Sequence, residues 1–190
     1  MGKKGNVFLL TLAVAAGAGV FAGNRLYDRV VIPKQHDDNE PDHAEVVTEG
    51  RRFVRNHPGR QDVYLESIDL LKLHAVYIEA EKPGETDGHR YVILVHGIGD
   101  HSEGMGIYAK HYLAEGVHTL IPDLRGFGKS EGGYVGFGYD DRLDIIEWIY
   151  WLLRQDPEAK ILLHGVSMGA ATVLMTSGEH LPASVVAVVA

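Results

Sequence analysis

The sequence predicts an α/β fold in which a mostly parallel sheet carries helices on both faces. From Asp62 onward, short apolar runs alternate with segments of helical spacing, and two alternating runs at the start favour a leading antiparallel hairpin. An uncharged stretch at residues 5–24 predicts a membrane helix before this domain. The apolar run at residues 184–190 has no polar residue after it, so we expect the chain to be the N-terminal part of a longer protein, truncated within a core strand.

The first sixty residues divide into three predicted parts. Residues 1–4 are a basic N-terminus, residues 5–24 are a membrane anchor or signal segment, and residues 25–60 are an acidic spacer that becomes helical from Ala44 towards Val54. Two interpretations of residues 5–24 stay open. An uncleaved anchor with Lys3 and Lys4 on the cytoplasmic side would hold the domain outside the cytoplasm, whereas cleavage near Ala16 would release a secreted protein.

The elements of the domain, residues 61–190, follow in order. Residues 63–65 and 71–78 alternate and pair as the hairpin, and residues 91–95 form a short buried strand. Ser102 is the expected N-cap of a helix that ends at Gly116, and the strand at residues 118–121 is stopped by Pro122. Residues 139–155 form a helix, residues 161–164 a strand, residues 168–177 a helix, and the run from Val185 a strand buried on both faces.

Composition excludes several classes of function. With 18 Lys and Arg against 26 Asp and Glu, the net charge of −8 argues against a nucleic-acid partner, which would need a basic face. Without cysteine there is no disulfide, no thiolate metal site and no cysteine nucleophile. The histidines form no metal motif, and we expect neither a metal nor a cofactor.

The chemistry is carried by a G-x-S-x-G sequence formed by Gly165, Ser167 and Gly169. An apolar strand precedes it and a helix follows, which is the context in which the serine occupies a strained corner with its hydroxyl exposed. The glycines are needed because a Cβ would collide with neighbouring backbone. The N–H of Met168, at the positive end of the helix, would face the place where an oxyanion forms.

A second loop follows the strand at residues 91–95 and contains His96, Gly97 and Ile98. A glycine-rich loop of this kind can offer another backbone N–H, that of Ile98, to complete an oxyanion hole with two donors.

A third motif, residues 123–130, ends in Gly128, Lys129 and Ser130 and imitates a phosphate-binding loop. That loop needs a glycine where Asp123 stands, and a carboxylate there would repel phosphate, so nucleotide binding is rejected. We interpret Asp123, Arg125 and Ser130 as structural residues that shape a loop beside the site; the alternative is a direct role in binding the substrate.

In order and spacing, these three motifs resemble the α/β-hydrolase superfamily, specifically its branch of serine aminopeptidase-like and monoglyceride-lipase-like proteins. Residues 134–144 resemble a bacterial subgroup that carries an N-terminal membrane segment. The resemblance implies that Ser167 is the nucleophile and that the backbone amides of Ile98 and Met168 are the oxyanion donors. It implies a small-molecule ester or amide substrate, with lipid-like esters among the candidates.

The sequence departs from this family in the other two members of the catalytic triad, which follow the nucleophile in the order acid, then histidine. Beyond Ser167 the chain offers only Glu179 and His180, which are adjacent at a helix end and do not fit. We therefore expect a His and an Asp in a missing C-terminal part and an inactive 190-residue fragment, because a serine without a base is a poor nucleophile. The alternative is a catalytically silent α/β-hydrolase scaffold with a binding role.

Overall fold

The computed structural model describes residues 18–33, 45–81 and 88–190, which fall into two compact units divided after Ile32. In the first unit, residues 18–30 form a helix with exposed side chains. Most of the predicted membrane segment, residues 5–24, lies outside the described residues. Within the described ranges, no helix combines the length and the apolar character that crossing a bilayer requires.

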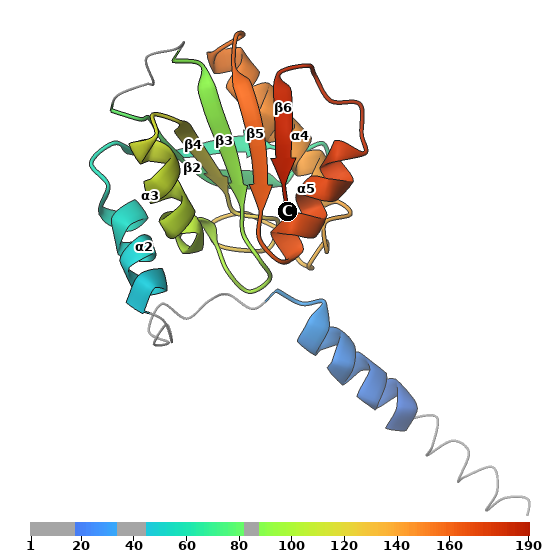
Figure 1. Cartoon of the computed structure of the whole chain (residues 1–190). Helices are drawn as coiled ribbons and strands as arrows, with labels where there is room; N and C mark the ends of the chain where they lie inside the picture. Colours follow the sequence, from blue (N-terminus) through green and yellow to red (C-terminus); the bar gives the residue numbers. More distant parts are fainter. Residues whose placement is uncertain (1–17, 34–44, 82–87) are drawn as a thin grey trace, which may run out of the picture. The chain divides into compact units, whose positions relative to one another are not determined.

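The described residues of the second unit form a six-stranded sheet (Figure 1). Its strands are β1 (Arg60–Glu66), β2 (Lys72–Ile78), β3 (Arg90–Val95), β4 (His118–Pro122), β5 (Lys160–Gly165) and β6 (Val185–Val189), in the order β1-β2-β4-β3-β5-β6. The β1–β2 and β2–β4 pairs are antiparallel, and the other neighbours are parallel. The leading hairpin and the mostly parallel sheet are therefore confirmed.

Helices cover both faces of this sheet (Figure 1). On one face lie α2 (Glu45–Asn56), the 3₁₀ helix η1 (Ser102–Met105) and α3 (Gly106–Ala114); on the other lie α4 (Asp141–Gln155) and α5 (Met168–Ser177). Alternate residues of each strand point to opposite faces, so Val92 and Leu94 pack under α2 and α3 while Tyr91 and Ile93 pack under α4 and α5.

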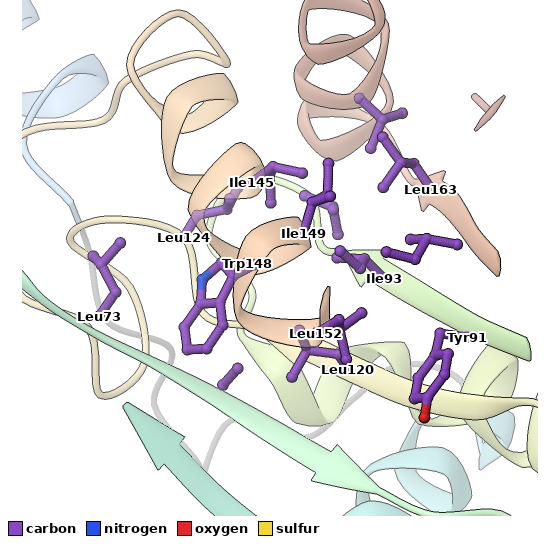
Figure 2. Close-up of a cluster of buried hydrophobic side chains, with 14 of the residues drawn as sticks. Leu73, Tyr91, Ile93, Leu120, Leu124, Ile145, Trp148, Ile149, Leu152 and Leu163 are labelled. Atoms are coloured by element: carbon purple, nitrogen blue, oxygen red, sulfur yellow. The ribbon is translucent and has the colours of Figure 1, made fainter. Parts of the chain in front are cut away.

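The larger core lies between the sheet and α4 (Figure 2). Trp148 and Ile149 of α4 are completely buried against strand residues such as Leu120. Because each such side chain contributes about 1.5–3 kcal/mol when it leaves water, this layer supplies much of the stability that holds the loops in place.

One local prediction was wrong. Ser102 is the first residue of η1 rather than a helix N-cap, and its N–H donates to the buried carboxylate of Asp123 at 2.6 Å. The apolar strand from Val185 lies at the edge of the described sheet, where β5 is its only described neighbour and Val186 is 61% exposed. Helix α2 agrees with the helical segment predicted from Ala44 towards Val54; it buries Val54 and packs against η1 and α3, so it joins the domain expected from Gln61.

Candidate active site

The serine of the G-x-S-x-G sequence stands at a sharp corner between β5 and α5. Ser167 has φ 55° and ψ −116°, a conformation that L-residues rarely adopt, and it is exposed. Such a backbone costs about 1–3 kcal/mol and persists only where the surroundings enforce it. The next residue, Met168, begins α5, so the corner turns directly into a helix N-terminus.

Close backbone packing enforces this corner. A Cβ added at Gly165 would lie 2.1 Å from the carbonyl oxygen of Gly169, and one at Gly169 would lie 2.1 Å from that of Val95 on β3. Both distances are far below van der Waals contact. The two glycines are therefore required by sterics, as the sequence predicts, and they bring the start of α5 against the end of β3.

A four-residue turn after β3 lies beside Ser167. The Asp100 N–H donates to the carbonyl of Gly97 at 3.3 Å, and Gly99 has φ 77°, so Ile98 is the second residue of this turn. A Cβ at Gly97 would be 3.3 Å from the Ser167 Cβ and 3.7 Å from its Oγ. Ile98 itself is half exposed. The structure thus brings together the two loops that the sequence predicts to meet.

Two backbone donors are available at this corner. Among the described residues, none accepts a hydrogen bond from the N–H of Ile98 or of Met168. The Met168 N–H lies in the first turn of α5, where the helix dipole favours negative charge. An oxyanion that formed next to Ser167 could therefore use donors that the fold leaves without a partner in the described part of the chain.

Comparison with known proteins places this site in a family. The model of the family described as serine aminopeptidase, S33, matches residues 86–190, which is more than half of the chain. The chain belongs to this family of α/β hydrolases.

Relatives of this S33 family member include large and small proteins. The chain is 33% identical over 94 residues to the multifunctional-autoprocessing repeats-in-toxin of Vibrio vulnificus, and the match covers 47% of this chain and 2% of the toxin. It is 29% identical over 90 residues to the uncharacterized protein YqkD of Bacillus subtilis, covering 47% of this chain and 30% of YqkD.

Among solved structures, the esterase Pf2001 of Pyrococcus furiosus is similar with a TM-score of 0.60 and 26% identity over 79% of this chain and 53% of the esterase. The serine hydrolase XC6422 of Xanthomonas campestris has a TM-score of 0.55 and 19% identity over 64% of this chain and 56% of that protein, which supports the fold alone. This S33 chain therefore spans about half the length of the esterase.

His96, at the end of β3, anchors the turn rather than facing solvent. It is fully buried, with Nδ1 2.7 Å from the carbonyl oxygen of Gly97 and Nε2 accepting the N–H of Leu124 at 3.0 Å. Burial lowers the pKa of His96. The neutral ring with its proton on Nδ1 satisfies both contacts, so His96 ties the turn to the loop after β4.

Asp123 organises that loop through its buried carboxylate, which accepts the N–H groups of Ser102 at 2.6 Å and Lys129 at 2.9 Å. Burial opposes its ionisation, but the hydrogen bond with His74 at 2.6 Å and those from the two amides lower the pKa of Asp123 to about 2. Because the Lys129 amide, which a phosphate would need, is bound by this carboxylate, the geometry agrees with the rejection of nucleotide binding.

Arg125 is buried and fully engaged with carboxylates. Its guanidinium donates two hydrogen bonds of 2.8 Å to Asp144 on α4 and two longer ones to Asp69 in the β1–β2 hairpin. The bonds to Asp144 raise the pKa of Arg125. Arg125 therefore links α4 to the hairpin, and the structural interpretation of this residue agrees with the geometry.

No base lies against the serine in the described part of the chain, where the Ser167 Oγ forms no hydrogen bond with an imidazole. Glu179 instead pairs with Arg142 at 2.7 Å, and His164 Nδ1 lies 3.0 Å from the hydroxyl of Tyr112.

Sequence reasoning missed two partners of the site. One is His74, which joins Asp123 to Asp62, with 2.7 Å between its Nε2 and the Asp62 carboxylate. The other is Arg51 of α2, which pairs with Asp100 at 3.0 Å. Neither has a local signal, because each partner is at least twelve residues away along the chain.

Proposed function

We propose that this chain is the nucleophile-bearing part of a serine hydrolase that works by acyl transfer on carboxylic esters or amides. The single observation that carries the proposal is the strained, exposed Ser167 corner with the Gly97–Asp100 turn against it. Membership of the S33 family supports the same activity.

In the proposed reaction, the Ser167 Oγ attacks the substrate carbonyl carbon and loses its proton to a base. The carbonyl π electrons move to oxygen, where the N–H groups of Ile98 and Met168 would donate to the new oxyanion. Collapse of this intermediate expels the alcohol or amine, which takes the proton back, and leaves an acyl group on Ser167. Attack by water, assisted by the same base, then releases the acid and restores the serine.

The base and its orienting acid are a His and an Asp that we assign to a part of the protein outside this chain. Two observations support the assignment: no imidazole hydrogen-bonds the Ser167 Oγ among the described residues, and the chain spans 53% of the esterase Pf2001. We expect the 190-residue chain by itself to turn over activated esters far more slowly than the complete protein.

Carboxylic esters are the proposed first substrate class. The likeness to an esterase at 26% identity favours them, while the family description includes aminopeptidases, so amides are the second class. Short and long acyl esters compared with aminoacyl amides, all on the complete protein, would separate the two by kcat/KM.

A fluorophosphonate probe tests the nucleophile, since it labels a serine only where a base and an oxyanion hole activate it. The complete protein should be labelled, Ser167→Ala should abolish labelling, and Ser177→Ala should not change it, because Ser177 is an exposed serine at the far end of the same helix. Labelling that survives Ser167→Ala removes Ser167 from this role. A folded complete protein that is never labelled would favour the silent scaffold.

We also propose that residues 5–24 attach the protein to a membrane with the hydrolase domain outside the cytoplasm. Carbonate extraction of membranes should leave the protein in the pellet. Release into the supernatant would favour cleavage of this segment as a signal.

A further inference from the structure

We propose that Arg51 of α2 is a positioning residue for the Gly97–Asp100 turn and acts through Asp100 to aim the Ile98 N–H. This inference rests on the proposed function, in which that N–H is an oxyanion donor. It concerns a helix that precedes residue 86, where the match to the S33 family begins.

The contact is an ion pair of limited exposure. Arg51 Nη2 lies 3.0 Å from Asp100 Oδ1, and the two side chains are 11% and 29% exposed. The same Oδ1 accepts the N–H of His101 at 2.8 Å. The Asp100 carboxylate also packs on Gly104, where an added Cβ would lie 2.1 Å from Oδ2. Asp100 is therefore held from three sides, and Arg51 supplies the opposite charge.

Asp100 also closes the four-residue turn that carries Ile98. Its N–H donates to the carbonyl of Gly97, so the two end residues are linked across Ile98 and Gly99. His96 holds the Gly97 carbonyl at the first end, and Arg51 holds Asp100 at the other. With both ends fixed, the peptide that bears the Ile98 N–H keeps one orientation.

Helix α2 can transmit a fixed position because it docks closely on η1 and α3. A Cβ at Gly106 would lie 1.9 Å from the carbonyl oxygen of Gly50, so the two helix backbones touch at a pair of glycines. Nearby, Arg55 of α2 and Arg60 of β1 both donate to Glu103 of η1, at 2.8 and 2.7 Å. The neighbouring position of α2 and α3 is visible in Figure 1.

Loss of this ion pair should reduce catalysis without abolishing it. Removal of a whole oxyanion donor costs about 10²–10³-fold in kcat, whereas a donor that is present but misaimed retains part of its effect. We expect Arg51→Ala to slow fluorophosphonate labelling and to lower kcat by about tenfold, with a smaller change in KM.

The experiment compares Arg51→Ala, Arg51→Lys, Asp100→Asn and the double variant Arg51→Ala/Asp100→Asn in the complete protein. Arg52→Ala is the matched control, because Arg52 is the next residue of the same helix and is exposed. Labelling rate, kcat, KM and thermal unfolding are measured for each. Amide hydrogen exchange of the peptide covering residues 96–102 reports on the turn independently of activity.

We expect Arg51→Ala to be labelled slowly and to show faster amide exchange in the turn, and Arg51→Lys to recover part of the labelling rate. Arg52→Ala should match the unaltered protein in both measurements. The double variant should be labelled no more slowly than the slower of the two single variants. Wild-type labelling in Arg51→Ala, additive effects in the double variant, or a loss of labelling that merely matches the unfolded fraction would overturn it. If the unaltered protein is not labelled at all, the proposed function fails. The exchange measurement then still decides whether Arg51 orders the turn.

Discussion

Replacing Ser167 by glycine and by alanine separates the cost of its backbone conformation from the loss of its hydroxyl. Both variants remove the Oγ and should abolish fluorophosphonate labelling. They differ in the Cβ, which is what makes φ 55° unfavourable at this corner. Ser167→Gly should therefore be the more stable of the two.

The expected difference follows from two opposing contributions. Release of the strained backbone stabilises the glycine variant by about 1–3 kcal/mol. Glycine also gives the unfolded chain more freedom, which costs about 0.4–1 kcal/mol. The net advantage over Ser167→Ala is about 1 kcal/mol, or a rise in Tm of about 3 °C for a domain of this size.

Urea unfolding followed by tryptophan fluorescence measures this difference, because Trp148 is completely buried and its ring lies 6.0 Å from that of Trp151 in the same helix. The same pair of substitutions at Ser177, the last residue of α5, is the control. There the sign should reverse, because helix propensity favours alanine over glycine by up to about 1 kcal/mol. A Ser167→Gly variant that is equally or less stable than Ser167→Ala would refute the claim that this corner is strained.

Three further predictions concern the surroundings of the site. In a urea titration, Gly169→Ala should lower the free energy of unfolding by about 3 kcal/mol, because its Cβ would lie 2.1 Å from a backbone carbonyl oxygen. Gly133→Ala is the control: it has open space around it and should change the free energy of unfolding by no more than about 0.5 kcal/mol. Equal costs would contradict the steric argument. Arg125→Met should cost about 3–5 kcal/mol, since it leaves the buried Asp144 carboxylate without its partner. Arg142→Met, at a pair with Glu179 that is partly exposed to solvent, should cost under about 1 kcal/mol, and a small cost at Arg125 would argue against its linking role. Burial raises the pKa of Asp141 from an ordinary 3.8 to about 6. Between about pH 4 and pH 6 the folded protein therefore keeps a proton on this carboxyl that the unfolded chain has released. The free energy of unfolding falls as the pH rises through this range. Relative to the unaltered protein, Asp141→Asn should therefore gain about 2–3 kcal/mol between pH 4 and pH 7, and a difference that does not vary with pH would show that Asp141 is not the group responsible.

Features with a local signal were predicted from the sequence. Helix α5 begins and ends at the predicted residues, Met168 and Ser177, because an apolar strand and a G-x-S-x-G sequence define the corner before it. The hairpin and the buried strands follow from alternation and apolar runs that need no knowledge of distant residues. The place of Ser167, exposed beside the Gly97 turn, belongs to this class.

Features that depend on distant partners could not be predicted. Serine is a preferred N-cap residue, but the N–H of Ser102 donates to the carboxylate of Asp123, 21 residues away, and Ser102 lies inside η1. A helix was predicted within the acidic spacer, but its packing on α3 was not, because the close crossing of Gly50 and Gly106 rests on two isolated glycines that give no pattern.

The position of β3 between β4 and β5 has a consequence for the whole layout. After β3 the chain passes through α3 to β4 on one side of it, whereas after the neighbouring β5 it passes through α5 to β6 on the other side, so the two connections leave in opposite directions from the carboxyl ends of β3 and β5. In open α/β sheets, ligands bind outside the carboxyl ends of the strands where the connections reverse in this way. Loops at these strand ends can change in length and composition while the sheet beneath them keeps its register.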